Sequence, residues 1–169
     1  MAAFSALNAV AVSMGGAASA FLGGVLADRW AATDARARTW IPAGGCLLAV
    51  LAITGVLYLP TFNASIALVF VHLLVAECWF GPTVSLLQSE LPSRLHGSAT
   101  SLLMFFGALV GSIAPLIVGI LDKQLVGAFI DSDSRLRFIL VTVVGGSYIT
   151  CALAFFACGR TMSMSKDNK

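Results

Sequence analysis

Charged residues are scarce in this chain: they make up 11% of its 169 residues, whereas an ordinary soluble domain carries roughly 25%. Hydrophobic residues make up 59%, and the mean hydropathy is +0.94. A chain this apolar could not cover a soluble surface, so we expect the lipid bilayer to be its solvent. The net charge is only +2 and the basic residues are scattered, whereas nucleic-acid binding would need a concentrated basic face.

Histidine and cysteine are also few, and none stands at a spacing that suggests chemistry. The sequence has no CxxC, HExxH or GxSxG pattern. We therefore expect no metal, no cofactor and no disulfide, and we interpret the four cysteines as small packing residues (Cys46, Cys78, Cys151 and Cys158). An intramembrane enzyme would need a nucleophile paired with a base, or two acids. Because neither arrangement is present, we predict that the chain is not an enzyme.

Long apolar runs fill most of the chain. Five of them, at about 2–27, 40–59, 64–87, 98–121 and 138–158, reach the roughly 20 residues that a helix needs to cross the bilayer. A helix satisfies its own backbone hydrogen bonds in lipid, so we predict an all-α membrane protein with five transmembrane helices. They would form one domain over residues 1–160, and residues 161–169 would be a short cytoplasmic tail.

The basic residues predict the orientation of these helices. Seven of them fall on one side of the predicted bundle and three on the other. The larger group follows the first, third and fifth runs, so we expect those connections and the C-terminus to be cytoplasmic. The N-terminus would then lie outside, with an apolar run that begins directly at Met1. This bare start and the odd number of helices suggest that a preceding segment is missing.

Small residues recur every fourth position in the first and fourth runs, where they would allow close helix packing. The two stripes are Gly16, Ala20, Gly24 and Asp28, and Gly107, Gly111, Pro115 and Gly119. Proline is expected to break the helix at Pro115 and again at Gly81-Pro82. Broken helices are typical of transporters, although tight packing alone would explain most of these positions.

Both striped runs end in an acid followed directly by a base, Asp28-Arg29 and Asp122-Lys123. The predicted topology makes these two runs antiparallel, and they are three helices apart. An inverted repeat of three helices would leave this pattern. Under that interpretation, one helix of the first triplet would precede the first run.

Two segments resemble a known family. "GGVLADRWAATDARAR" resembles the cytoplasmic loop motif of the major facilitator superfamily, which carries a glycine, an Asp-Arg pair and later basic residues. "GPTVSLLQSELPSRLHGSATSLLMFFGALVGSIAPLIVGILD" and "DSDSRLRFIL" resemble the last three helices of Spinster-like members. The resemblance covers roughly Ser13 to Arg160. It implies a C-terminal transporter half that lacks its first helix, with helices eight to twelve of twelve present.

The loop departs from the family pattern, because Ala31, Ala32 and Thr33 dilute its basic cluster. The family's proton-coupling residues belong to the N-terminal half and match nothing in this chain. For the loop motif itself (Gly24, Asp28, Arg29, Arg36 and Arg38), the resemblance implies a charge latch in which Asp28 faces a helix of the other half. The adjacent Arg29 could pair with Asp28, and a simple helix stop is the alternative.

Polar residues inside the runs are candidates for binding a substrate or a proton. Glu77 lies near the centre of the third run, where a carboxylate is costly and usually functional. His72 is five residues earlier and turned roughly 140° away, so we expect no direct pair with Glu77. Asn8 is a further candidate. A structural glutamate and an interfacial histidine are the alternatives.

Together these features predict a secondary active transporter that alternates access by rocking two halves. The resemblance implies an amphipathic lipid or a small organic solute as substrate, and the missing N-terminal half as partner. A noncatalytic membrane subunit or a nonfunctional truncated half-transporter is the alternative. We expect the isolated chain to fold without transporting.

Overall fold

The computed structural model describes residues 9–34 and 36–167, and every regular element within these ranges is helical. The elements are η1 (Ala11–Gly15), α2 (Gly16–Ala31), α3 (Ala37–Tyr58), α4 (Phe62–Ala76), η2 (Glu77–Trp79), α5 (Phe80–Glu90), η3 (Ser93–Leu95), α6 (His96–Gln124), α7 (Ser132–Leu140), η4 (Val141–Gly145) and α8 (Gly146–Asp167). Several of them follow one another without a loop, so η1 continues into α2, α4 into α5 through η2, and α7 into α8 through η4.

Four of the resulting helices are long and apolar enough to cross a membrane, at 37–58, 62–90, 93–124 and 132–161. This finding is compatible with an integral, multi-pass membrane protein. The helix formed by η1 and α2 corresponds to the first predicted run, but the start of that run lies outside the described residues. The all-helical class agrees with the sequence prediction.

Proline ends two of the long helices. Leu59 and Leu91 each precede a proline and have extended backbone, with ψ of 135° and 148°. The proline ring disfavours helical backbone in the preceding residue, so the chain leaves the helix there. The last helix has different limits from those predicted. It begins at Ser132 and continues to Asp167, through most of the segment expected to be a tail.

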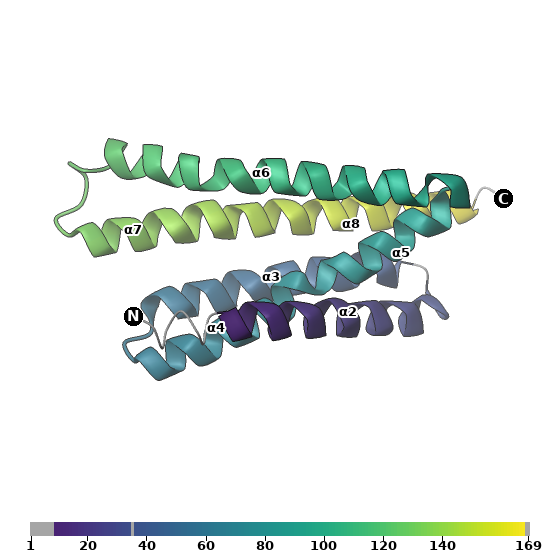
Figure 1. Ribbon diagram of the computed structural model, residues 1–169, viewed down its shortest axis with the longest axis horizontal. Coiled ribbons are helices and arrows are strands. Elements are labelled where there is room, and N and C mark those ends of the chain that lie inside the picture. Colours follow the sequence, from purple (N-terminus) through teal and green to yellow (C-terminus); the bar gives the residue numbers. More distant parts are fainter. Residues whose placement is uncertain (1–8, 35, 168–169) are drawn as a thin grey trace.

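The helix α3 is the centre of the bundle and packs against α2, α4 and α8 (Figure 1). Its buried positions are nearly all small: Ala37, Thr39, Pro42, Ala43, Gly45, Cys46, Ala49 and Ala52. Small residues let helix backbones approach closely, which compensates for the weak hydrophobic driving force in lipid. The core is therefore built from close backbone contacts rather than from large interlocking side chains.

The helices run alternately in opposite directions, and the connections gather at two ends (Figure 1). The α2–α3 and α5–α6 connections lie at the same end as the C-terminus, with Arg29, Arg36, Arg38, Arg94 and Arg160. The opposite end carries Lys123, Arg135 and Arg137. These five and three arginine and lysine residues thus lie at opposite ends of the bundle, in the two groups into which the sequence prediction divided them.

Candidate functional site

The long apolar helix over residues 62–90 changes its winding at Glu77. Residues Glu77–Trp79 form a single turn of 3₁₀-helix between α4 and α5. Pro82 lacks the N–H that would bond to the carbonyl of Cys78, and its ring crowds that carbonyl. The helix tightens immediately before this point. The predicted break near Gly81-Pro82 is present, four residues nearer the N-terminus than the Gly-Pro pair itself.

Glu77 is the C-terminal cap of α4 and stands just before the first turn of α5. The chain stays helical through this turn, since the Glu77 N–H bonds to the Leu73 carbonyl and the Phe80 N–H bonds to the Glu77 carbonyl. The Glu77 side chain is half-buried. A Cβ placed on Gly16 of α2 would be 4.0 Å from Glu77 Cγ, so the carboxylate stem lies against a glycine.

The Glu77 carboxylate has no hydrogen-bond or ion-pair partner within 9–34 and 36–167. Asn8, the third polar candidate, lies outside the described residues. Glu77 is therefore a carboxylate within the spanning segment whose oxygens are free to accept hydrogen bonds or a proton.

His72 is part of a polar contact among three helices. Its Nδ1 is 3.3 Å from the Ala49 carbonyl of α3, and its Nε2 is 3.3 Å from the Tyr148 hydroxyl of α8. A carbonyl can only accept, so Nδ1 carries the proton, and a neutral His72 then accepts from Tyr148 through Nε2. The two rings also meet edge to face, with centroids 5.6 Å apart. Sequence reasoning missed Tyr148, because nothing near it in the sequence marks it.

The first small-residue stripe packs against the interrupted helix, although the buried face is turned by one residue from the prediction. Gly15, Ser19, Gly23 and Ala27 are buried, whereas Gly16, Ala20 and Gly24 flank them and are half-buried. Ser19 donates a hydrogen bond to the Leu74 carbonyl at the centre of this contact. The Ala20 carbonyl and the Gly24 backbone lie directly over Gly81, where no Cβ would fit.

Asp28 forms an ion pair with Arg38 rather than with the adjacent Arg29. The Arg38 guanidinium is 3.4 Å from Asp28 Oδ1, and the Ser85 hydroxyl donates to the same oxygen at 3.3 Å. The expected pair with Arg29 is wrong because consecutive residues of a helix point in different directions. The Asp28 carboxylate thus joins α2, α3 and α5 at one end of the bundle, while Arg38 Nε is buried without a partner among the described residues.

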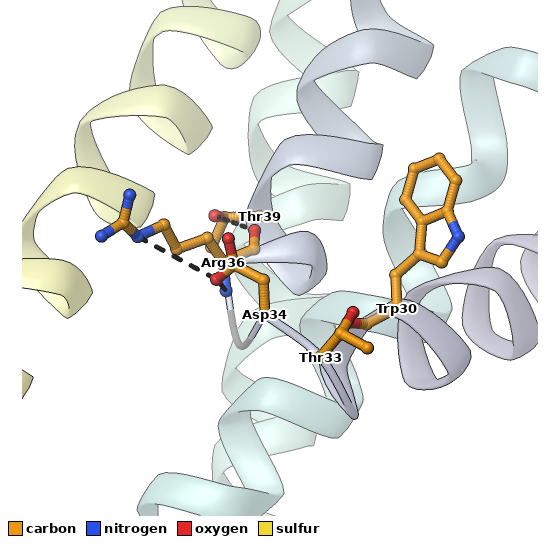
Figure 2. Close-up of polar contacts among 5 residues, drawn as sticks. All are labelled: Trp30, Thr33, Asp34, Arg36 and Thr39. Atoms are coloured by element: carbon orange, nitrogen blue, oxygen red, sulfur yellow. Dashed lines mark hydrogen bonds and ion pairs between the residues drawn. The ribbon is translucent and has the colours of Figure 1, made fainter.

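The short connection from α2 to α3 is held by its own polar residues (Figure 2). Asp34 Oδ1 accepts from the backbone N–H of Arg36 at 2.9 Å and is 4.0 Å from the Arg36 Nε. Thr33 donates to the Trp30 carbonyl, and Thr39 donates to the Arg36 carbonyl. Local bonds of this kind stabilise a tight turn. They place Arg36 beside α8 (Figure 2), whereas Arg38 pairs with Asp28.

The second small-residue stripe meets nothing in the part of the chain that the structure describes. A Cβ added at Gly107, Gly111 or Gly119 would have no atom within 4 Å. The helix that carries them, α6, has no buried residue, and the elements that it contacts most are its sequence neighbours η3, α5 and α7. Its expected break at Pro115 is absent, since α6 is continuous from His96 to Gln124.

Asp122, the acid at the end of the second glycine-striped helix, pairs with an arginine of the following helix, as Asp28 does. Asp122, at the end of α6, accepts a hydrogen bond from Arg135 Nε of α7 at 2.7 Å. In both cases an acid that ends a glycine-striped helix pairs with an arginine near the start of the following helix. The two pairs lie at opposite ends of the bundle.

A groove of about 470 Å³ lies among α3, α5, α6 and α8. Its lining comes from α3, η2, α5, α6 and α8: Cys46, Trp79, Thr83, Leu86, Leu103, Tyr148, Cys151, Ala154, Phe155 and Cys158. Three of the four cysteines therefore face one space, although all four are free. No group of histidine, cysteine and acidic residues within the described ranges is arranged to hold a metal ion.

No protein-family model and no curated protein matches this sequence significantly. The functional interpretation therefore rests on the geometry of the helices and their polar groups.

Proposed function

We propose that this chain is the C-terminal half-domain of a secondary active transporter, of the Spinster-like type within the major facilitator superfamily. The observation that carries the proposal is the position of Glu77. It is an unpaired carboxylate at a break in a spanning helix, next to a glycine-lined helix crossing. Discontinuous helices with polar groups near the middle of the membrane are typical of binding sites in transporters.

In this proposal Glu77 accepts a proton or a substrate hydrogen bond at the midplane. The polar contact of His72 with Tyr148 and the Ala49 carbonyl joins α4, which Glu77 caps, to α8 and α3. The substrate is an amphipathic lipid or a small organic solute. No cofactor and no enzymatic step is involved.

The second element of the proposal is a latch at the basic end, which we assign to the cytoplasmic side together with the C-terminus. The Asp28 carboxylate, Arg38 and Ser85 hold three helices together there. An N-terminal half, on the same native chain or on a separate one, would rock against this bundle. Opening to the cytoplasm would break or rearrange the Asp28 contacts.

Transport by the native product in vesicles tests this proposal. The gene product is tagged after Lys169, purified from its own membrane, and weighed by mass spectrometry. It is then reconstituted, and uptake of a fluorescent lysophosphatidylcholine and of a labelled organic anion is measured. We expect a product with further helices before Met1, and uptake of one of the two probes that falls at least about tenfold in Glu77→Gln, which is 1.4 kcal/mol.

Glu90→Gln is the matched control, because Glu90 is the other acid of the helix over residues 62–90 and is exposed at the end of that helix. It should leave uptake unchanged. Equal uptake by wild type and Glu77→Gln would refute the assigned role of Glu77.

A noncatalytic membrane subunit is the second candidate, and the bare surface of α6 favours it. A helix whose glycine stripe touches nothing in the described ranges is suited to packing against another membrane chain. A native product of 169 residues that copurifies with a second membrane protein and moves neither probe would support this candidate instead.

A further inference from the structure

The groove between α5, α6 and α8 is a separate feature from the Glu77 site. Its lining follows α8 from Tyr148 to Cys158, which is about 15 Å at 1.5 Å per residue. This is about half of the ~30 Å hydrocarbon thickness of a bilayer. Cys46 of α3 and Leu103 of α6 both line it, so the groove is bounded by the central helix as well as by α6.

The groove offers an occupant almost no hydrogen bonds. The Thr83 hydroxyl already donates to the Trp79 carbonyl at 2.6 Å, and the Tyr148 hydroxyl is bonded to His72. The rest of the lining is aliphatic, aromatic or thiol. Water needs two to four polar partners to be stable in such a space, so the groove is unsuited to holding it.

The groove also opens to the surroundings, because Cys151, Ala154 and Cys158 in its lining are exposed. An empty groove would leave its walls without dispersion contacts. All of its walls belong to segments that are long and apolar enough to span a membrane. The molecules that surround those segments in a bilayer are phospholipids, whose acyl chains are flexible, unbranched and free of polar groups.

We propose that this groove is a binding site for one acyl chain of a bilayer phospholipid, which fills the space between α6 and α8 as a resident lipid. The lipid would supply lateral contacts that α6 does not receive from residues 9–34 and 36–167. Phe155 and Trp79 would both contact the chain. This site goes beyond the transport proposal, since a resident lipid would be held whether or not the protein moves a substrate.

Photocrosslinking within vesicles tests the site directly. The full chain is reconstituted in palmitoyl-oleoyl phosphatidylcholine that contains a trace of the same lipid with a diazirine in its acyl chain. After irradiation, adducts along α8 are mapped by mass spectrometry. We expect adducts on Cys151, Ala154 and Phe155 to exceed those on Leu153 and Phe156, which are exposed residues of α8 outside the groove lining.

Ala154→Trp fills the groove, and Ile149→Trp places the same side chain on an exposed position of α8 outside it. Groove adducts should fall by about tenfold in Ala154→Trp, because the indole occupies the space in which the chain makes its contacts. They should be unchanged in Ile149→Trp. If Ala154→Trp does not give a monodisperse protein, Cys151→Phe fills the same space and serves instead.

Equal labelling of both faces of α8, or groove labelling that persists in the filled variant, would overturn the proposal. A second copy of the chain in the groove would also overturn it. That arrangement would bring two Cys151 residues together and give a disulfide-linked dimer when vesicles are oxidised with copper phenanthroline. Failure of the lipid site would leave the role of Glu77 unaffected, because the uptake assay measures that role independently.

Discussion

The contact between α2 and α5 makes a sharp prediction about glycine. A Cβ added at Gly81 would be 2.6 Å from the Ala20 carbonyl oxygen and 3.0 Å from Gly24 Cα. Both are backbone atoms, so the helices themselves would have to separate. Gly81→Ala should therefore destabilise the bundle. Overpacking of this kind costs about 1–3 kcal/mol, from which a gain in helix propensity of roughly 0.5–1 kcal/mol is subtracted.

Two other glycines provide matched controls for the same substitution. A Cβ at Gly24 would be 3.8 Å from Gly81 Cα, an ordinary contact distance, and a Cβ at Gly107 would meet nothing within 4 Å. Gly24→Ala should be tolerated even though it lies in the same crossing as Gly81. Gly107→Ala should be neutral or mildly stabilising, because the higher helix propensity of alanine is then the only effect of the substitution.

Thermal melting in detergent, followed by size-exclusion chromatography, measures these differences. A change of 1 kcal/mol shifts the Tm by about 2–4 °C for a chain of 150–250 residues. Gly81→Ala should lower the Tm by several degrees relative to both controls. If Gly81→Ala and Gly24→Ala have the same Tm, the close approach of α2 and α5 is wrong.

Three further predictions concern polar groups. Tyr148→Phe removes the O–H that His72 Nε2 accepts, and it should cost about 0.6 kcal/mol, the average for such bonds in membranes; a double-mutant cycle with His72→Phe measures the coupling, which should vanish if the contact does not form. Asp28→Asn should lower the free energy of unfolding by only about 0.2–1 kcal/mol, the contribution of an exposed ion pair. The loss of uptake rate, expressed as a free energy, should be larger than this. Equal losses of uptake and of unfolding free energy would argue for a purely structural role. Asp131 is the N-cap of α7, and the backbone N–H and hydroxyl of Ser134 hold the pKa of its carboxyl below the ordinary value. The ionised Asp131 therefore stabilises the start of α7 at pH values above the ordinary pKa. This stabilisation is lost as the pH falls through the lowered pKa. The protection of the Ser134 amide against hydrogen exchange, corrected for the pH dependence of the intrinsic exchange rate, should decline with acidification in wild type but remain constant in Asp131→Asn. A decline in both proteins would show that another group causes the loss of protection.

Two of the helix ends follow directly from the local sequence. Leu59 and Leu91 leave the helix because a proline follows each of them, and that information is local. The position of the 3₁₀ turn could also have been found from sequence. A proline affects the carbonyl four residues before it, so Pro82 points to Cys78 rather than to Gly81.

The register of the first stripe was less accessible. The predicted positions, with Gly16 first, and the buried positions, with Gly15 first, have the same spacing and differ by one residue, about 100° around the helix. Both sets are rich in small residues, so composition alone could not separate them. Packing against η2 decides the difference, because Gly23 faces the Cys78 backbone.

The polar contacts depend on residues far apart in the sequence. His72 and Tyr148 are separated by 76 positions, and no pattern near either one announces the other. Asp28 is different: its pairing with Arg38 follows once α3 is known to begin at Ala37, next to the turn. Sequence reasoning chose Arg29 because adjacency was taken for contact, although adjacent helical residues diverge.

The account depends most directly on Glu77 facing a water-accessible space within the membrane. This can be measured by the reaction of Glu77→Cys with a membrane-impermeant methanethiosulfonate, in the native product with its own cysteines replaced by alanine. Val71→Cys, an exposed position of α4 in the same spanning helix, is the control. Thiolates form and react in water rather than in hydrocarbon, so the account predicts labelling at 77 at least about tenfold faster than at 71. Equal and negligible labelling at both positions would contradict it.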